Sequence, residues 1–345
     1  MKYTIIPNTT IEVSKICLGT MTFGEQNTEA EGHAQMDFAL EKGINFFDTA
    51  EMYSVPGRKE TYGSTEKIIG TWFKKTGNRD KVILASKIAG PNPGLSYIRE
   101  NMDFSPASIA LSIEKSLTRL QTDYIDLYQL HWPERKTNFF GQRGYKVQDD
   151  AWEDNIHTVL ETLEKFIKEG KIRNIGVSNE TPWGIMRFLE ESKMNNLPRI
   201  KTIQNPYSLL NRLFENGSAE IAMRENVGLL AYSPLAFGVL SGKFLSGESH
   251  PKARLSLFPQ FSRYNSAQCT QATRLYQEIA NQNGLSLTQM ALAFVNQQPF
   301  VTSNIVGATN LTQLQENIDS INVVLSETIL KEINNVQSAI PDPAP

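Results

Sequence analysis

The chain has 345 residues, of which 40% are hydrophobic and 21% charged, and its formal net charge is −3 at pH 7. This composition provides a large core, and the lack of a basic balance argues against nucleic acid or an anionic membrane as a partner. No stretch approaches the roughly 20 apolar residues of a membrane span, and from its first residues we do not expect a secretory signal. The two cysteines, Cys17 and Cys269, lack metal-ligand spacing, so we expect a cytoplasmic protein without a metal site.

Alternation within residues 2–14, with a turn near Asn8, predicts a short β-hairpin at the start of the chain. Strand and helix patterns then alternate as far as the C-terminus. The predicted strands end near Gly19, Asp48, Lys87, His131, Asn179, Asn205, Tyr232 and Gly307. The predicted helices cover residues 29–42, 65–75, 106–120, 155–168, 183–193, 214–225, 272–281 and 288–297, with one more after Asn310 and a last one near 327–337.

Eight successive strand–helix units predict a single (β/α)8 TIM barrel domain over residues 1–345, with an N-terminal β-hairpin and extra C-terminal helices. A doubly wound sheet is the alternative, but its usual Gly-rich phosphate turn does not match residues 19–24. Two connections, residues 132–153 and 233–265, are longer than ordinary strand–helix loops. They are candidate lids or binding loops.

Four polar residues stand at or just after neighbouring strand ends: Asp48, Tyr53, Lys87 and His131. Each alone has an ordinary structural explanation, such as a helix cap for Asp48 or a rim aromatic for Tyr53. In a barrel, however, all the carboxyl ends of the strands face one mouth, so these four side chains would be neighbours. Together they indicate a joint catalytic role.

The chemistry of this group suits carbonyl reduction. A phenol has a pKa near 10 and is a weak acid catalyst at neutral pH, but a nearby ammonium favours the phenolate. We therefore expect Lys87, held by Asp48, to lower the pKa of Tyr53 by roughly two to three units. His131 would donate a hydrogen bond to a carbonyl oxygen beside the Tyr53 hydroxyl and polarise it for attack by a hydride.

The sequence resembles the aldo-keto reductase family over nearly the whole chain. The motifs that carry the resemblance are residues 19–24 (GTMTFG), 48–50 (DTA) with Tyr53, 66–70 (EKIIG), 86–87 (SK), 130–133 (LHWP), 176–179 (GVSN), 204–207 (QNPY) and 232–235 (YSPL). It is closest to the bacterial Tas-type branch, which shares the wording of residues 21–26 and 204–212. The resemblance implies an NADP(H)-dependent reductase of aldehydes or ketones, acting on a small-molecule carbonyl substrate.

The same resemblance implies roles for individual residues. Tyr53 would be the general acid, Lys87 and Asp48 its tuning pair, and His131 the substrate-orienting donor, with Trp132 in the substrate pocket. Ser178, Asn179 and Gln204 would bind the nicotinamide amide, and Tyr232 would stack on its ring. The remaining implied cofactor contacts are Gly19, Thr20, Met21, Asp48, Ser233, Pro234, Leu235, Gly307, Thr309, Gln313, Glu316 and Asn317.

The phosphate end is expected at the helix that starts after Gly307, where backbone N–H groups suit an anion. Many family members have a basic residue in this turn, and here the turn is neutral. Related branches use a Lys and an Arg from the loop after the seventh strand, which correspond to Lys243 and Arg254. Basic residues in a long loop are often simply solvated. If Lys243 and Arg254 bind the ribose phosphate, however, they favour NADPH over NADH.

Several alternatives stay open from the sequence. A cofactor-sensing regulatory subunit, similar to the potassium-channel β subunits, would have the same four residues. A barrel isomerase or aldolase would use Lys87 as a Schiff base, free of Asp48. The side chains of Met21, Phe23, Trp132, Phe140 and Trp183 fit either an apolar pocket or core and rim packing, and the sequence does not indicate the oligomeric state or the physiological carbonyl.

Overall fold

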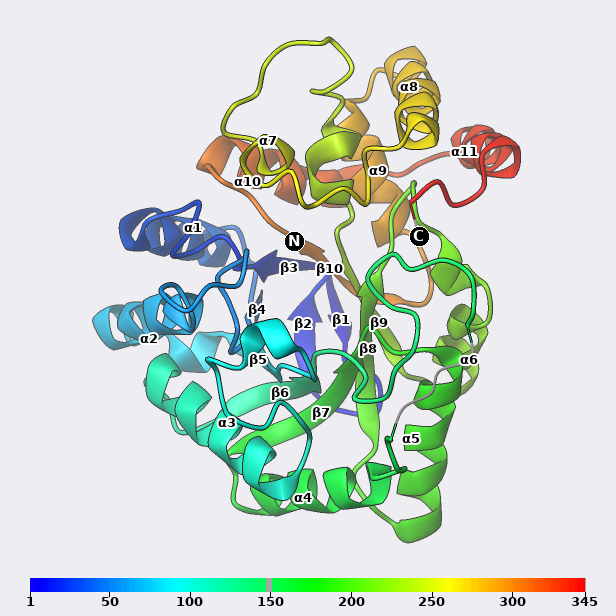
Figure 1. The fold of residues 1–345 in the computed structure, drawn as a ribbon. Helices are drawn as coiled ribbons and strands as arrows, with labels where there is room; N and C mark the ends of the chain where they lie inside the picture. The colour runs from blue at the N-terminus through cyan, green and yellow to red at the C-terminus, as the bar shows by residue number, and fades with distance from the viewer. Residues whose placement is uncertain (147–150, 345) are drawn as a thin grey trace.

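The computed structural model describes residues 1–146 and 151–344. Its centre is a closed barrel of parallel strands in the order β10-β3-β4-β5-β6-β7-β8-β9 (Figure 1). The barrel closes where β10 pairs with β3, with Ile305 opposite Cys17. The strands are β3 (Ile16–Gly19), β4 (Phe46–Asp48), β5 (Ile83–Ile88), β6 (Ile125–Leu130), β7 (Ile172–Ser178), β8 (Ile200–Pro206), β9 (Gly228–Tyr232) and β10 (Val301–Val306). The predicted (β/α)8 barrel is confirmed.

The N-terminal hairpin is also confirmed. Strands β1 (Tyr3–Ile5) and β2 (Glu12–Ser14) pair antiparallel, and Asn8 in the turn has a φ of 57°, which asparagine tolerates better than most residues. Ile6 and Val13 pack against the apolar side chains inside the barrel. The hairpin therefore closes one end of the barrel and leaves the other end for a site.

Helices surround the barrel, and those from α7 to α11 lie together on one side of it (Figure 1). The α-helices are α1 (Glu29–Glu41), α2 (Ser64–Thr76), α3 (Pro106–Leu120), α4 (Ile156–Lys168), α5 (Pro182–Asn195), α6 (Ser218–Arg224), α7 (Arg254–Leu257), α8 (Ala267–Gln282), α9 (Leu287–Asn296), α10 (Leu311–Asp319) and α11 (Glu327–Ala339). Short 3-10 helices are η1 (Arg79–Lys81), η2 (Pro93–Leu95), η3 (Leu213–Glu215), η4 (Ala236–Ser241) and η5 (Ser320–Asn322). The predicted extra helices at the C-terminus are α10 and α11.

Two predicted helices have wrong limits. The helix expected over residues 214–225 begins only at Ser218, because Gly217 takes a φ of 101° and separates it from η3. The helix expected from residue 272 begins at Ala267, where the Ser266 side chain accepts a hydrogen bond from the Cys269 N–H and caps the first turn.

The two long connections differ in structure. The 233–265 connection contains η4 and α7, which no periodic pattern had predicted. The 132–153 connection contains neither helix nor strand in its described residues. The rest of that connection, residues 147–150, lies outside the part of the chain that the structure describes, so its proposed role as a lid stays a prediction.

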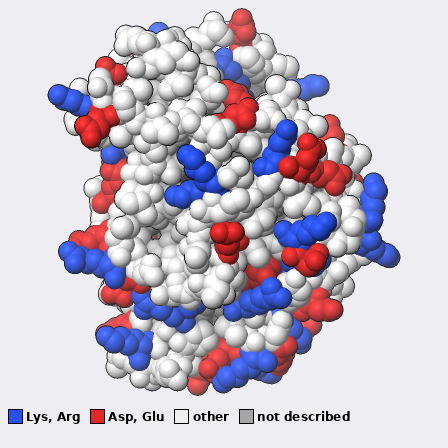
Figure 2. Space-filling model, turned by 180° about the vertical axis from the view of Figure 1, so that it is seen from behind, with Lys and Arg blue, Asp and Glu red and all other residues white. Residues whose placement is uncertain are grey.

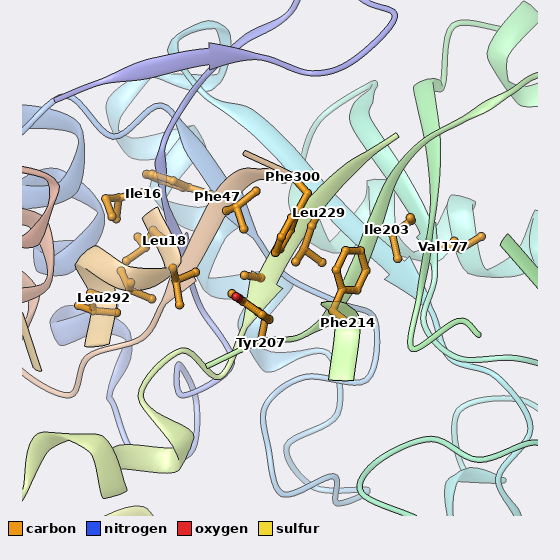
Figure 3. Close-up of a cluster of buried hydrophobic side chains, with 14 of the residues drawn as sticks. Ile16, Leu18, Phe47, Val177, Ile203, Tyr207, Phe214, Leu229, Leu292 and Phe300 are labelled. Atoms are coloured by element: carbon orange, nitrogen blue, oxygen red, sulfur yellow. The ribbon is translucent and has the colours of Figure 1, made fainter. Parts of the chain in front are cut away.

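Strand alternation decides which side chains face the barrel axis. Leu18, Ile203 and Leu229 point outward into the core between strands and helices (Figure 3), whereas their neighbours Cys17 and Leu230 pack inside the barrel. The next inward position lies two residues further along each strand. By this rule Asp48 follows Phe46, Lys87 follows Ala85 and Gln129 follows Leu127, so that polar side chains form the inner layer at the carboxyl ends.

The surface carries charge of both signs. On the face shown in Figure 2, lysine and arginine side chains are interspersed with aspartate and glutamate. None of the helices within the described residues is both long and apolar enough to cross a membrane. The same residues contain no group of three His, Cys, Asp or Glu side chains placed to hold a metal ion. The interpretation of the chain as one domain stays a prediction.

Candidate active site

A cavity of about 1540 Å³ opens at the carboxyl ends of the strands. It exceeds the roughly 300–1,000 Å³ of most small-molecule sites and suits a large ligand, or two ligands side by side. Lys87 lies beneath it, fully buried. The other predicted site residues all line it: Gly19, Thr20, Met21, Asp48, Tyr53, His131, Trp132, Ser178, Asn179, Gln204, Tyr232, Ser233, Pro234, Leu235, Lys243, Arg254, Gly307, Thr309, Gln313, Glu316 and Asn317.

A buried ion pair forms the floor of the cavity. The Lys87 Nζ donates to Asp48 Oδ2 and to the Thr49 carbonyl oxygen, each at 2.7 Å. The other carboxylate oxygen of Asp48 accepts a hydrogen bond of 2.8 Å from Gln204 Nε2. Burial opposes the charge on Lys87, but the negative charge of Asp48 raises its pKa above the ordinary value. Lys87 is therefore a fixed cation.

Tyr53 lies over this cation on a firmly anchored loop. Two residues before it, the buried Glu51 carboxylate accepts hydrogen bonds from Arg99 at 2.6 Å and from the Ala89 N–H at 2.7 Å. The Lys87 Nζ is 4.9 Å from the centroid of the Tyr53 ring. The His131 ring meets Tyr53 edge-on, with 5.7 Å between the ring centroids.

The expected direction of the Tyr53 pKa shift is wrong. Burial raises the pKa of Tyr53 above its usual value, and the charge of Lys87 opposes this rise without reversing it. Loss of water disfavours the phenolate by more than the single cation favours it. Tyr53 is therefore protonated at neutral pH, which is the form that donates a proton.

His131 is neutral at the same pH. Burial, and then the charge of Lys87, hold its pKa well below the usual range. Within the described residues its Nδ1 has no hydrogen-bond partner. A neutral imidazole has one N–H donor, so His131 is able to donate a hydrogen bond without adding a charge.

Hydrogen bonds link the ends of the next strands. The Tyr232 hydroxyl donates to Asn179 Oδ1 at 2.6 Å, and Asn179 Nδ2 donates to the His131 carbonyl oxygen at 2.8 Å. The Ser178 hydroxyl donates to the Gln204 carbonyl oxygen at 2.8 Å. Amide and hydroxyl groups thus gather beside the Tyr232 ring, an arrangement that fits a flat heterocycle with an amide substituent.

Two cations line the cavity from the 233–265 connection. The Arg254 guanidinium lies 5.4 Å from the Phe237 ring centroid, and burial lowers the pKa of Arg254 to about 10. Burial and the charge of Arg254 also lower the pKa of Lys243. Neither cation forms a salt bridge with any described residue. Half-buried cations without an acid partner fit a phosphate-bearing ligand.

The start of α10 is less open to a phosphate than the sequence suggested. The Thr309 N–H donates to Gln313 Oε1 at 3.0 Å, and the Gln313 N–H donates to Asn310 Oδ1 at 2.9 Å. Two of the expected backbone donors are thus already engaged. Further along α10, Glu316 accepts a hydrogen bond of 2.7 Å from Ser286, and the Asn317 side chain donates to the Gly307 carbonyl oxygen at 3.2 Å.

The apolar candidates divide between the cavity and the rest of the fold. Met21, Trp132 and Phe140 line the cavity. Phe23 is fully buried in the core, and the Trp183 ring is half exposed and packs on the Arg135 guanidinium at 4.7 Å.

Sequence reasoning missed several polar residues at this site, among them Gln129 and Arg263. Gln129 approaches Asp48 Oδ1 at 3.5 Å, and strand alternation from Leu127 could have placed it there. Arg263 lines the cavity from the 233–265 connection. The only sequence signal for Arg263 is its place between Phe261 and Tyr264 in a long loop.

Comparison with known proteins adds to this geometry. Residues 15–338 match the family model described as "Aldo/keto reductase family". The chain is 51% identical to Protein tas of Escherichia coli (strain K12), with 100% of both chains covered. It is 34% identical to the uncharacterized oxidoreductase YrpG of Bacillus subtilis (strain 168), covering 97% of this chain and 96% of YrpG. Its identity to the norsolorinic acid reductase stcV of Emericella nidulans is 29%, over 96% of this chain and 79% of that protein.

Proposed function

Because the chain belongs to the aldo/keto reductase family, we propose that it is an NADP(H)-dependent oxidoreductase that reduces aldehyde or ketone carbonyls to alcohols. Membership of the family carries the general part of this statement, an oxidoreductase that uses a nicotinamide cofactor. The observation that supports the catalytic part is the contact of Tyr53 with both Lys87 and His131 at one end of the cavity.

The proposed mechanism assigns a proton to Tyr53. A nicotinamide cofactor, when bound, supplies the hydride for the carbonyl carbon. His131 donates a hydrogen bond to the carbonyl oxygen, and Tyr53 gives that oxygen its proton. The Lys87 ammonium stabilises the phenolate that develops on Tyr53, and this interaction strengthens as the reaction proceeds. Asp48 keeps Lys87 charged and in place.

The cofactor assignment rests on the cavity's polar and charged groups. Ser178, Asn179 and Gln204 would hold the nicotinamide amide beside Tyr232, and Lys243 and Arg254 would bind phosphate. The 2′-phosphate that distinguishes NADPH from NADH would give these cations a further anionic partner. We therefore favour NADPH. A cytoplasmic location stays a prediction.

A Schiff-base isomerase or aldolase is disfavoured. Its lysine must be a free amine, whereas Lys87 is buried and donates to Asp48 and to the Thr49 carbonyl oxygen. A cofactor-sensing subunit is compatible with the same four residues, so turnover must distinguish it from an enzyme.

The test is a fluorescence titration of the protein with NADPH and NADH, followed by turnover on a panel of aromatic and dicarbonyl aldehydes. An enzyme gives NADPH binding and repeated turnover. Tight NADPH retention without turnover, together with a stable partner in a pull-down, would instead favour the sensor. Failure to bind either nucleotide would exclude both readings.

A further inference from the structure

The cavity is far more basic than the chain as a whole. Its described lining includes the basic residues Arg143, Lys243, Lys252, Arg254 and Arg263, against the acidic residues Asp48 and Glu316. Asp48 is already paired with Lys87. The proposed function uses Lys243 and Arg254 for phosphate. Three basic residues of the lining have no role in that function. Of these, Arg143 and Lys252 are exposed, whereas Arg263 is half-buried.

Ring contacts connect Arg263 to the catalytic end of the cavity. Its guanidinium carbon lies 5.8 Å from the Phe140 ring centroid. The Phe140 ring is 5.8 Å from Trp132, and Trp132 is 5.0 Å from His131. A row of ring contacts therefore runs from Arg263 through Phe140 and Trp132 to His131.

The charge of Arg263 is not neutralised by the protein. No carboxylate among the described residues forms a salt bridge with it, and its buried Nη1 has no hydrogen-bond partner there. Its polar neighbours are Tyr232 and Tyr264. Burial raises the pKa of both phenols, so neither supplies a negative charge at neutral pH. A half-buried guanidinium that has no carboxylate partner in the described part of the chain is suited to bind an anionic group of a ligand.

We propose that Arg263 determines specificity by binding a carboxylate carried by the substrate, so that the enzyme prefers aldehydes with a carboxylate beyond an apolar spacer. A planar guanidinium matches a carboxylate in two hydrogen bonds. Trp132 and Phe140 would contact the spacer. This inference rests on the proposed function, because it assumes that the carbonyl lies between Tyr53 and His131.

The test compares two aldehydes of the same shape, 4-carboxybenzaldehyde and 4-carbamoylbenzaldehyde. The wild type should show a kcat/KM for the carboxylate about tenfold or more above that for the amide. In Arg263→Gln this ratio should fall by about 10- to 100-fold, and Arg263→Lys should restore part of it. The matched control is Arg274→Gln on α8, which removes the same charge at an exposed position outside the cavity lining.

A contact must be separated from a general positive field. Arg143 lines the cavity but is exposed, and its Nη2 donates to the Asp342 carbonyl oxygen. Arg143→Gln should lower the carboxylate-to-amide ratio much less than Arg263→Gln does. Equal effects of the two substitutions would overturn the assignment of Arg263 as the contact.

Binding measurements keep this inference distinguishable from the proposed function. Benzoate and benzamide are titrated into the NADP⁺-bound protein, with tryptophan fluorescence as the readout. Tighter binding of benzoate in the wild type, lost in Arg263→Gln, is expected whether or not the aldehydes are turned over.

Three outcomes would separate the alternatives. If the wild type shows a carboxylate-to-amide ratio near one both in kcat/KM and in affinity, the inference is contradicted. A higher Kd for NADPH in Arg263→Gln with an unchanged ratio would show that Arg263 binds the cofactor instead. If turnover of both aldehydes is absent while benzoate is still preferred, the proposed function fails, and with it the preference among aldehydes, but the contact between Arg263 and a carboxylate is supported.

Discussion

At the scale of single residues, the environment of Tyr53 decides which proton transfer its hydroxyl is suited to. Burial raises the pKa of the phenol, and Lys87, 4.9 Å from its ring centroid, opposes that rise. The cation therefore acts chiefly on the phenolate that forms after the proton has left. This division suits an acid that is protonated at rest and whose conjugate base is stabilised.

The first prediction follows from this role. Tyr53→Phe removes the proton donor but retains the ring, so kcat for aldehyde reduction should fall by about 10²- to 10⁴-fold. The Kd for NADPH, measured by fluorescence titration, should stay within about twofold, because the hydroxyl contributes little to holding a dinucleotide. Tyr145→Phe, at an exposed position, is the control. A Tyr53→Phe enzyme that keeps most of its rate would mean that the acid is another group.

A second prediction concerns pH. The raised pKa of Tyr53 keeps it protonated, and the lowered pKa of His131 keeps it neutral, between about pH 6.5 and 9. The rate of reduction should therefore be flat over this range. Alcohol oxidation needs the phenolate, whose fraction rises about tenfold per pH unit below the pKa, so the oxidation rate should increase with pH.

Steady-state profiles in both directions check this expectation. A reduction rate that already declines between about pH 7 and 8 would place the pKa of the working acid near neutrality, against the effect of burial.

The sequence predicts the positions of these residues correctly, but it does not predict the direction of the Tyr53 pKa shift. Their positions at strand ends follow from hydrophobic runs that stop at Asp48 and Lys87. The sign of the Tyr53 shift depends on how much water the folded cavity removes from the phenol, and no pattern in the chain states that.

At the scale of elements, strand alternation explains why the site exists at all. The rule that puts Phe46 inside the barrel also turns Asp48 inward, and it does the same for Ala85 and Lys87. Helix limits are less predictable. Helix α6 begins later than predicted because of the backbone conformation of Gly217, and α8 begins earlier because Ser266 caps it. Hydrophobic periodicity is not clear in either stretch, so it could not indicate these limits.

The packing of two helices outside the barrel gives a third prediction. Gly70 of α2 lies against the backbone of α3, where an added Cβ would clash with the Arg119 carbonyl oxygen. Because backbone atoms cannot move aside as a flexible side chain does, Gly70→Ala should lower the free energy of unfolding by about 1–3 kcal/mol despite the better helix propensity of alanine.

Thermal unfolding of Gly70→Ala should show a lower Tm than the wild type. Lys74→Ala, at an exposed position one turn later on α2, is the control and should change Tm little. A Tm for Gly70→Ala at or above that of the wild type would show that α2 and α3 separate at no cost.

At the scale of the whole molecule, the barrel separates stability from chemistry. The hairpin fills one end, and the polar inner layer with the long connections occupies the other. The count of eight strand–helix units was enough to predict this architecture. How the 233–265 connection brings Lys243, Arg254 and Arg263 to the cavity could not be predicted, because a long irregular loop has no repeating pattern.

The contrast between an acidic chain and a basic cavity gives a fourth prediction. Lys243→Met and Arg254→Met should each raise the Kd for NADPH by about tenfold, and the Kd for NADH less, if these cations bind the 2′-phosphate. The dependence of NADPH binding on salt should weaken in both variants. Lys193→Met on the exposed surface of α5 is the control. Equal losses for the two nucleotides would place the cations on the shared pyrophosphate.

The most direct measurement follows the hydride itself. The protein is mixed in a single turnover with NADPH deuterated at both C4 positions and with 4-carboxybenzaldehyde, and the product is analysed by mass spectrometry and NMR. Carbonyl reduction by hydride transfer predicts the alcohol with one deuterium on the carbinol carbon, at a rate that Tyr53→Phe strongly reduces. Bound NADPH that yields no alcohol, or an alcohol without deuterium, would contradict a carbonyl reductase.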